Sequence, residues 1–210
     1  MINKLNKKGN LPAIVFVFSK KSLNYLAEYS AENLNLVTSE ERRKIATFFE
    51  RSVSRLKEHD REILQLLTLK NLLIRGIGIH HGDLLSICKE IVEILLENNL
   101  IKLLFATDSF AMGLNMPAKS VIFNSIRKHD GKAFRTLHNG EYTQMCGRAG
   151  RRGIDTEGSA YMFIPTKEDF PNIYDLKLMM DSKGEYLESK FKLNYQIIIN
   201  SYSSDSFKVD

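Results

Sequence analysis

Arginine and glycine crowd the segment QMCGRAGRRGID, which runs from Gln144 to Asp155. A guanidinium group binds phosphate through a planar pair of N–H donors, so closely spaced arginines can recognise a nucleotide or a nucleic-acid backbone. Three interpretations compete. The segment is a glycine-rich loop that holds phosphates, a basic tract that contacts nucleic acid, or a set of arginines that reach a nucleotide bound elsewhere.

The phosphate-loop interpretation fails on residue order. Such a loop reads GxxxxGK[ST] and follows a strand, but the first strand-like segment, PAIVFVFSKK, contains no glycine. The only Gly-Lys pair in such a context, at Gly131, lacks the second glycine five residues earlier. The sequence also contains no Asp-Glu dipeptide that could hold magnesium at a strand end. We therefore expect that this chain does not hydrolyse ATP by itself.

Helical spacing would place the key polar side chains on one stripe. If residues 140–152 form a helix, Gln144, Arg148 and Arg151 lie at i, i+4 and i+7. Gly147 and Gly150 would each cost about 1 kcal/mol relative to alanine, which indicates a close approach of the backbone to another surface. A guanidinium pair reaching a phosphate across an interface and a solvated face that binds RNA nonspecifically both fit this pattern.

Buried strands separated by helices are expected along most of the chain. Apolar segments without polar alternation predict strands at residues 12–18, 77–83, 100–108, 120–126 and 159–165. Helices are expected from Ser19, from Thr38 with a Thr38–Glu41 capping box, from Asp60, and over residues 84–99, 140–147, 169–180 and 185–202. This order predicts an α/β fold with a mostly parallel sheet covered by helices on both faces.

Ligands of parallel sheets gather at the carboxyl ends of the strands. Ser19, Thr107, Asp108 and the segment around Gln144 follow predicted strands or precede them closely, so we expect them at one shared edge.

The composition of the chain bears on whether it binds a polyanion, a membrane or a metal ion. The chain has 210 residues, 43% of them hydrophobic, and a net charge of +5, which suits a polyanionic partner without requiring one. Its longest apolar run, Ala13–Phe18, is far shorter than the ~20 residues that span a bilayer, and the N-terminal segment lacks the apolar core of a signal peptide. Cys88 and Cys146 form no CxxC pair. We expect no membrane partner and no metal site.

Several motifs in order resemble a known family. QMCGRAGRRGID resembles the last conserved motif of superfamily-two helicases, QxxGRxGR, and FATDSFAMGLNMPAKSVIF resembles the preceding motif in its superkiller-type, DExH-box form. PAIVFVFSKK is similar to the motif that opens the second RecA-like domain, and RGIGIHHGDLL, SIRKHDG and GEYTQM complete the pattern. The resemblance runs from Pro12 to Pro165, and KFKLNYQIIIN is similar to the start of a winged-helix region.

The resemblance implies a three-layer RecA-like domain over residues 12–168. A lead-in would occupy residues 1–11, and a short helical extension that starts a winged-helix region, cut short by the chain end, would occupy residues 169–210. ATP with Mg²⁺ would bind between this domain and a first RecA-like domain, which supplies the phosphate loop and the acidic magnesium motif.

The resemblance also assigns candidate residues. Arg148 and Arg151 would be arginine fingers, and Gln144 would position the nucleotide or its attacking water. Gly113 and Asn115 would lie beside the nucleotide. The candidates for RNA contact are Ser19 and Thr107, through hydroxyls and nearby amides, and Arg127, which is also a candidate for contact between domains. The plain alternative for Thr107 is a cap at a strand end.

One turn departs from the family pattern. The family has His-His-Ser-Gly-Leu where this chain has His80-His81-Gly82-Asp83-Leu84, so an acid stands beside a segment that the family places near RNA. No RNA contact of this turn is therefore carried over.

The implied function is that of the second motor domain of a helicase that moves along RNA in the three-prime to five-prime direction and feeds it to an exosome. The implied partners are RNA, the first RecA-like domain and superkiller or exosome subunits. RKHDG and EYTQM are more similar to the cytoplasmic superkiller helicase than to its nuclear relative. The alternatives are a non-catalytic, degenerate RecA-like module that binds RNA or protein, and a self-contained basic RNA binder.

Overall fold

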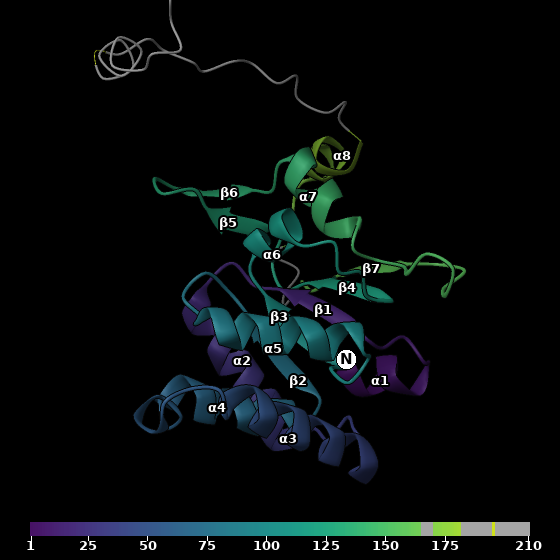
Figure 1. The fold of residues 1–210 in the computed structure, drawn as a ribbon. Coiled ribbons are helices and arrows are strands. Elements are labelled where there is room, and N and C mark those ends of the chain that lie inside the picture. Colours follow the sequence, from purple (N-terminus) through teal and green to yellow (C-terminus); the bar gives the residue numbers. More distant parts are fainter. Residues whose placement is uncertain (165–169, 182–194, 196–210) are drawn as a thin grey trace, which may run out of the picture.

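A five-stranded parallel sheet forms the centre of the computed structural model, which describes residues 1–164, 170–181 and 195. The strand order is β2-β3-β1-β4-β7 (Figure 1). The bounds are β1 Ala13–Phe16, β2 Ile77–His80, β3 Leu103–Ala106, β4 Ser120–Phe123 and β7 Ser159–Met162. All four pairings are in parallel register, so the last residues of the five strands lie at the same edge. The predicted parallel α/β sheet is confirmed.

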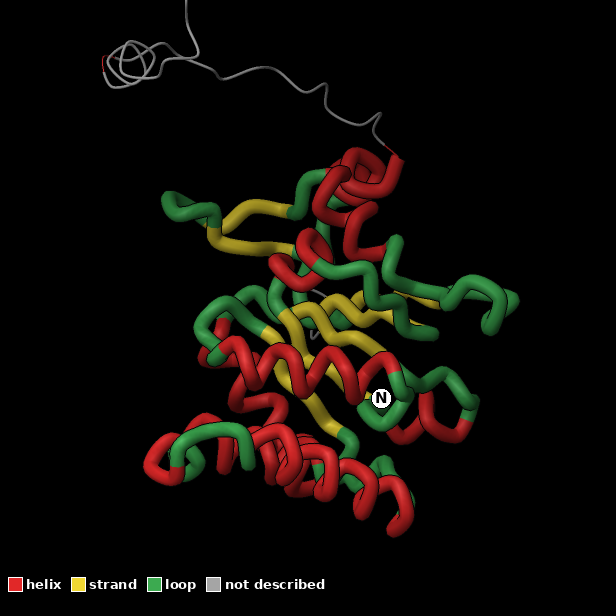
Figure 2. The backbone as a smooth tube through the Cα atoms, in the orientation of Figure 1, coloured by secondary structure: helices red, strands yellow, loops and turns green. Residues whose placement is uncertain are grey.

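Helices cover both faces of this sheet, as expected. Helix α2 (Lys20–Asn33) and helix α4 (Leu64–Leu73) lie on one side of the strands, and helix α5 (Ser86–Glu97) lies on the other (Figure 2). Helix α3 (Ser39–Val53) packs beside α4 and α5 near the β2 edge. The chain moves outward from β1 to β2 through α2, α3 and α4 and returns to β3 through α5, as the strand order requires.

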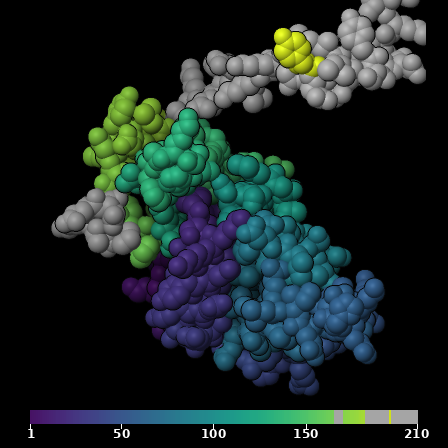
Figure 3. All heavy atoms as spheres, turned by 90° about the vertical axis from the view of Figure 1, so that its left-hand side faces the viewer, coloured from purple at the N-terminus to yellow at the C-terminus, as the bar shows by residue number. Residues whose placement is uncertain are grey.

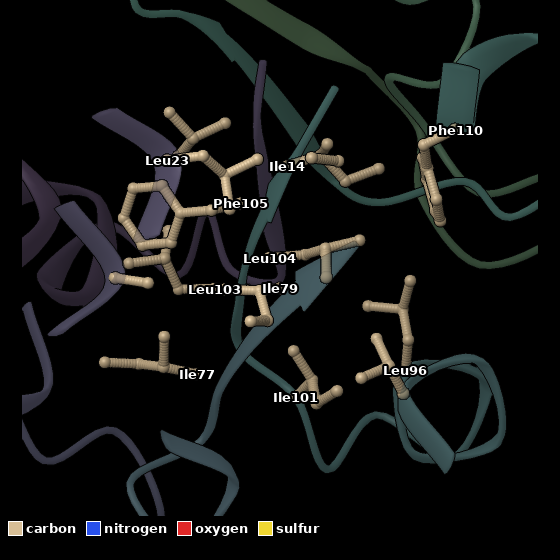
Figure 4. Close-up of a cluster of buried hydrophobic side chains, with 14 of the residues drawn as sticks. Ile14, Leu23, Ile77, Ile79, Leu96, Ile101, Leu103, Leu104, Phe105 and Phe110 are labelled. Atoms are coloured by element: carbon tan, nitrogen blue, oxygen red, sulfur yellow. The ribbon is translucent and has the colours of Figure 1, made fainter. Parts of the chain in front are cut away.

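The core lies between these layers. Every residue of β1, β2, β3 and β4 is buried, which accounts for the absence of polar alternation in their sequences. In the close-up, Leu23 of α2 lies on one side of the strands and Leu96 of α5 on the other, with Leu104 and Phe105 between them (Figure 4). The edge strand β7 is only partly buried.

Two helix starts follow the predicted capping. The Ser19 Oγ accepts a hydrogen bond from the Ser22 backbone N–H at 3.3 Å and caps α2. Thr38 and Glu41 form the predicted capping box of α3, with Glu41 N–H donating to Thr38 Oγ1 at 3.2 Å and Thr38 N–H to Glu41 Oε2 at 2.8 Å.

Several elements were not predicted. They are α1 (Ile2–Lys7), the single-turn η1 (Glu58–Asp60), α6 (Asp108–Gly113) and an antiparallel hairpin of β5 (Arg127–His129) and β6 (Phe134–Thr136). The expected lead-in thus contains a helix whose Leu5 is buried. Helix α8 (Ile173–Asp181) corresponds to the helix expected at residues 169–180. The helix expected at 185–202 and the winged-helix segment lie outside the described residues, apart from position 195.

The helix expected at residues 140–147 is confirmed, but it does not continue through the arginines, so the condition for one stripe of Gln144, Arg148 and Arg151 is not met. Helix α7 (Asn139–Cys146) ends before the arginines, and Gly147 is its C-cap. Gly150 has φ +90°, a conformation that favours glycine and ends any helical path. A Cβ on Gly158 would lie 2.5 Å from the backbone of Ala149. Glycine is therefore needed at position 158 because two segments of this chain pass close to each other there. Arg148 and Arg151 therefore stand on a loop.

Candidate nucleotide- and RNA-binding site

The three candidates for RNA contact follow the carboxyl ends of three adjacent strands. Phe16 of β1 pairs with Ala106 of β3 and with Phe123 of β4, so Ser19, Thr107 and Arg127 all come shortly after the same edge of the sheet. Ser19 and Arg127 are exposed, whereas Thr107 is only 8% exposed. The expected edge thus exists for Ser19 and Thr107, and Arg127, which was not placed there from the sequence, follows the same edge.

The Thr107 hydroxyl does not act as a plain helix cap. Thr107 occupies the N-cap position of α6, but its side chain makes no capping hydrogen bond to the backbone. Its Oγ1 instead lies 2.8 Å from the Ser109 Oγ. The hydroxyls of Thr107 and Ser109 therefore lie together at the start of α6, directly after β3. One of them can donate a hydrogen bond to an anion.

Arg148 lies at the opposite end of α6. Its Nη1 donates to the Asn115 Oδ1 at 2.9 Å, and its Nη2 donates to the carbonyl oxygen of Ala111. Its Nε is buried and has no hydrogen-bond partner among the described residues. A Cβ on Gly113 would meet no atom within 4 Å, so packing in the described part of the chain does not require glycine there. The structure thus brings Arg148, Asn115 and Gly113 together.

The backbone fixes the arginine loop beside the start of β4. Ala118 N–H donates to the Arg148 carbonyl at 2.9 Å, and Gly150 N–H donates to the Ala118 carbonyl at 2.8 Å. Because Ala118 precedes β4, this bridge lies towards the amino ends of the strands. The expectation of one shared edge is therefore wrong for Arg148 but holds for helix α7, which carries Gln144 and whose Tyr142 stacks on Phe123 at the carboxyl end of β4. Helix α6 instead connects the two regions.

Arg151 is held by an acid and an amide. Its Nε and Nη2 bind the two carboxylate oxygens of Asp155 at 2.8 and 2.9 Å, and its Nη1 donates to the Asn99 Oδ1 at 2.6 Å. Hydrogen bonds from the Arg151 side chain lower the pKa of Asp155 to about 2. Arg148 and Arg151 thus have separate partners and are not paired with each other.

Gln144 is exposed on α7, and its side chain makes no hydrogen bond to another described residue. The structure does not join it to either arginine.

Arg127 lies beside a cavity of about 430 Å³ between the hairpin and the segment that follows β7. Its Nη2 donates to the Phe134 carbonyl at 3.5 Å, and its backbone N–H donates to the Ser125 Oγ at 3.0 Å. In the space-filling view this teal-green part of the chain lies above the purple and blue helices (Figure 3). Phe134, Phe163 and Phe170 also line the cavity and are exposed.

An ion-pair network that sequence reasoning missed links the hairpin to α6 and α7. Lys128 Nζ lies 2.6 Å from Asp108 Oδ2 and 2.8 Å from Glu141 Oε1, and Arg135 forms two hydrogen bonds to Glu141 at 2.8 and 2.9 Å. Burial raises the pKa of Glu141, but the bonds from Arg135, Lys128 and the His138 N–H outweigh it and lower that pKa to about 2. Partners from separate elements leave no periodic signal in a sequence.

The described residues also bear on whether this part of the chain could hold a metal ion or span a membrane. No group of three or more His, Cys, Asp or Glu side chains is placed to hold a metal ion in the part that the structure describes. Over the same residues, no helix has the length and apolar character needed to cross a bilayer.

Comparison with known proteins identifies the domain. Residues 30–153 match the family described as the helicase conserved C-terminal domain. The chain belongs to this helicase family. This membership and the sheet topology confirm the resemblance and the RecA-like architecture expected from the motifs.

Three known proteins are similar in sequence to this chain over nearly all of its length. The chain is 44% identical over all 210 residues to superkiller complex protein 2 of Homo sapiens and to the DExH-box ATP-dependent RNA helicase DExH11 of Arabidopsis thaliana. It covers 17% and 15% of those proteins. It is 41% identical over 200 residues, 95% of its length, to exosome RNA helicase MTR4 of Mus musculus, and covers 19% of it. This helicase domain thus spans less than a fifth of the relatives that it matches.

Proposed function

We propose that this chain is the second motor domain of an ATP-dependent RNA helicase, which acts together with a first RecA-like domain. The similarity to RNA helicases over the whole chain supports this proposal. The observation that carries it is the position of Arg148, whose guanidinium is held at one end of α6 by Asn115 while Thr107 begins the other end. One short helix thus connects the candidate nucleotide site with the candidate RNA edge.

In this proposal, the nucleotide lies between the two RecA-like domains. Arg148 and Arg151 approach its terminal phosphate and stabilise the charge that develops during transfer to water. Gly113 leaves room for the nucleotide beside Asn115, and Gln144 orients the nucleotide or the attacking water. Mg²⁺, which neutralises charge on phosphate oxygens when bound, is assigned to the acidic motif of the first domain, because the described residues offer it no cluster of ligands.

The RNA backbone is proposed to cross the carboxyl edge of the sheet. Ser19 and the Thr107–Ser109 pair offer hydroxyls there, and Arg127 offers an exposed cation from the hairpin. Contacts of this kind bind phosphate and sugar without reading bases, which suits a protein that moves along many sequences. Closure on ATP and reopening after hydrolysis would shift this edge along the strand.

The direction of movement is proposed to be three-prime to five-prime, and the product strand is proposed to enter an exosome. Superkiller or exosome subunits are the proposed protein partners, and the cytoplasm is the proposed compartment, with the nucleus as the alternative. Two relatives support the proposed protein partners, since one is named as a superkiller complex protein and one as an exosome RNA helicase.

Arginine substitutions in the full-length protein test the proposal. Arg148→Ala should lower RNA-stimulated ATP hydrolysis by about 10³-fold, because an arginine finger of this type contributes on that scale. Arg152→Ala is the matched control, since Arg152 is exposed and has no hydrogen bond or ion pair among the described residues. It should leave the rate within a few-fold of the original.

Thermal unfolding of both variants separates loss of chemistry from loss of fold. Near-normal turnover in a folded Arg148→Ala protein would contradict the arginine-finger role. An original protein that binds RNA but hydrolyses no ATP would favour the non-catalytic module instead.

A further inference from the structure

Asp83 places a carboxylate at the edge of the sheet where RNA phosphates are proposed to lie. It follows the carboxyl end of β2, whose last residue, His80, pairs with Ala106 of β3. Its Oδ1 lies 2.7 Å from the Nζ of Lys20, the first residue of α2 after Ser19. Both side chains are exposed, at 52% for Lys20 and 66% for Asp83. The Asp83 carboxylate is thus paired with Lys20, the residue next to Ser19, which is a candidate RNA contact.

Other positive groups surround the same carboxylate. The Lys89 Nζ donates to the Gly82 carbonyl at 3.1 Å, one residue before Asp83. The Lys20 hydrogen bond lowers the pKa of Asp83, and the charges of Lys20 and Lys89 act in the same direction. Asp83 is therefore ionised at neutral pH, and it stands where two lysine side chains from separate helices meet.

The turn that carries Asp83 is fixed to the domain. The Gln65 side chain of α4 donates to the Asp83 carbonyl at 3.2 Å and accepts from the Leu85 N–H at 2.7 Å. The adjacent Leu84 is 95% buried, with 5% of its surface exposed. The backbone cannot move away from the edge without breaking these contacts. The Lys20 side chain, with four rotatable carbons, is the partner that can move.

We propose that Asp83 competes with an RNA phosphate for Lys20 and thereby weakens RNA binding by this domain. Lys20 is then a further RNA contact, and Asp83 sets how much that contact contributes. The inference rests on the proposed function, because it requires RNA at this edge. When Lys20 turns to a phosphate, Asp83 loses its partner and takes up a cation from solution. The cation released from the RNA phosphate by Lys20 is thus balanced by the cation that Asp83 takes up, so binding releases no net counterion at this contact.

Removing the carboxylate charge should restore that release. Each phosphate contact to single-stranded nucleic acid steepens the slope of log K against log salt by about 0.7. Asp83→Asn should therefore make the slope steeper by about 0.7 and tighten binding about fivefold near 0.1 M salt. Conversely, Lys20→Gln should weaken binding, because it removes the contact and leaves the Asp83 carboxylate unpaired at the edge where the phosphate lies. In the double variant, the gain from Asp83→Asn should disappear.

The experiment measures binding of a fluorescent oligouridylate to the full-length protein without nucleotide, over about 0.05 to 0.3 M salt. Glu40→Gln is the matched control. Glu40 also holds an exposed lysine, Lys44, at 2.7 Å, but it stands on α3, away from the carboxyl edge. Its substitution changes the net charge equally and should leave both affinity and salt slope as in the original.

Three results would overturn the inference. The first is unchanged binding by Asp83→Asn while the original protein binds RNA measurably. The second is an equal gain from Glu40→Gln, which would indicate a general charge effect. The third is a gain from Asp83→Asn that persists with Lys20→Gln. If the original protein and all variants fail to bind RNA, the proposed function itself fails, and the inference fails with it.

Discussion

At the scale of single residues, Arg151 is a largely buried charge that is held in one orientation by an acid. Asp155 binds two nitrogens of its guanidinium and also accepts from the Arg151 backbone N–H at 3.0 Å. The Asp155 side chain is only 5% exposed. A fork–fork pair of this kind fixes the plane of the guanidinium. The Nη1 that binds Asn99 projects away from Asp155 and is the part of the group that a phosphate could reach.

Asp155→Asn should therefore disturb Arg151 without removing it. The variant loses one charged hydrogen bond and should unfold with a free energy about 2 kcal/mol lower than the original at pH 7, as measured by urea denaturation. In the full-length protein, ATP hydrolysis should fall by about tenfold, because the arginine is less well positioned. The control is Glu157→Gln, an exposed acid two residues further on. Equal stability of the Asp155→Asn and Glu157→Gln proteins would contradict the stabilising role of the pair, and equal rates of ATP hydrolysis would contradict the positioning role.

At the scale of elements, the hairpin, α6 and α7 are tied together through Glu141. Its side chain is 15% exposed and binds Lys128 of β5 and Arg135 of β6. Lys128 in turn binds Asp108, the first residue of α6. The helix that connects the two candidate regions and the hairpin that carries Arg127 are thus held by the same carboxylate.

Glu141→Gln should loosen these three elements in a pH-dependent manner. The pKa of Glu141 is about 2 in the folded chain and 4.5 for the reference group, so its ionised form stabilises the fold above about pH 4.5. This contribution is lost as the pH falls towards 2. The variant should unfold with a free energy about 2 kcal/mol lower than the original at pH 7, and the difference should shrink below pH 4.5. Denaturant titrations at several pH values measure it.

Glu90→Gln, a substitution at an exposed acid of α5, should show no such trend. A Glu141→Gln difference that stays constant from pH 7 to pH 3 would show that the contact is not ionic.

The same elements show what a sequence can predict. The five strands and the caps at Ser19 and Thr38 depend on local patterns, namely continuous apolar runs and side chains that satisfy free backbone N–H groups, and they were predicted to within a few residues. The path of the arginine loop could not be predicted, because it passes close to a distant segment: a Cβ on Gly150 would lie 3.3 Å from the Cα of Gly158, eight residues away. Spacing alone could not reveal that crossing.

In the candidate site too, some positions could be predicted from the sequence and some contacts could not. Ser19, Thr107 and Arg127 could be placed at one edge, because each follows a strand of a parallel sheet. Two partners could not be predicted, since Asn115 and Asn99 lie 33 and 52 residues from Arg148 and Arg151 in the chain. Such pairs exist only after the strands have assembled. The Asp155 partner of Arg151, four residues away, is a local pair that spacing could have indicated. The roles assigned to these residues remain predictions that the substitutions above test.

At the scale of the whole molecule, the proposed work is divided between two domains. The described residues form a buried hydrophobic core around the sheet, from Leu5 to Met179, and on this basis we expect the domain to fold alone. Its sequence contains no GxxxxGK[ST] segment, and the proposed RNA path crosses only one edge of its sheet. Folding and catalysis thus have different requirements in this protein.

The isolated chain should therefore fold but show no measurable ATP hydrolysis, with or without RNA. It should also bind single-stranded RNA at least ~100-fold more weakly than the full-length protein at physiological salt, because about half of the phosphate contacts are lost with the other domain. Circular dichroism tests folding, phosphate release tests hydrolysis, and fluorescence anisotropy tests binding. Micromolar or tighter binding by the folded chain alone would instead favour a self-contained RNA binder. In that case the carboxyl edge would need no second domain, and Lys20, Ser19 and Arg127 would have to hold the strand themselves.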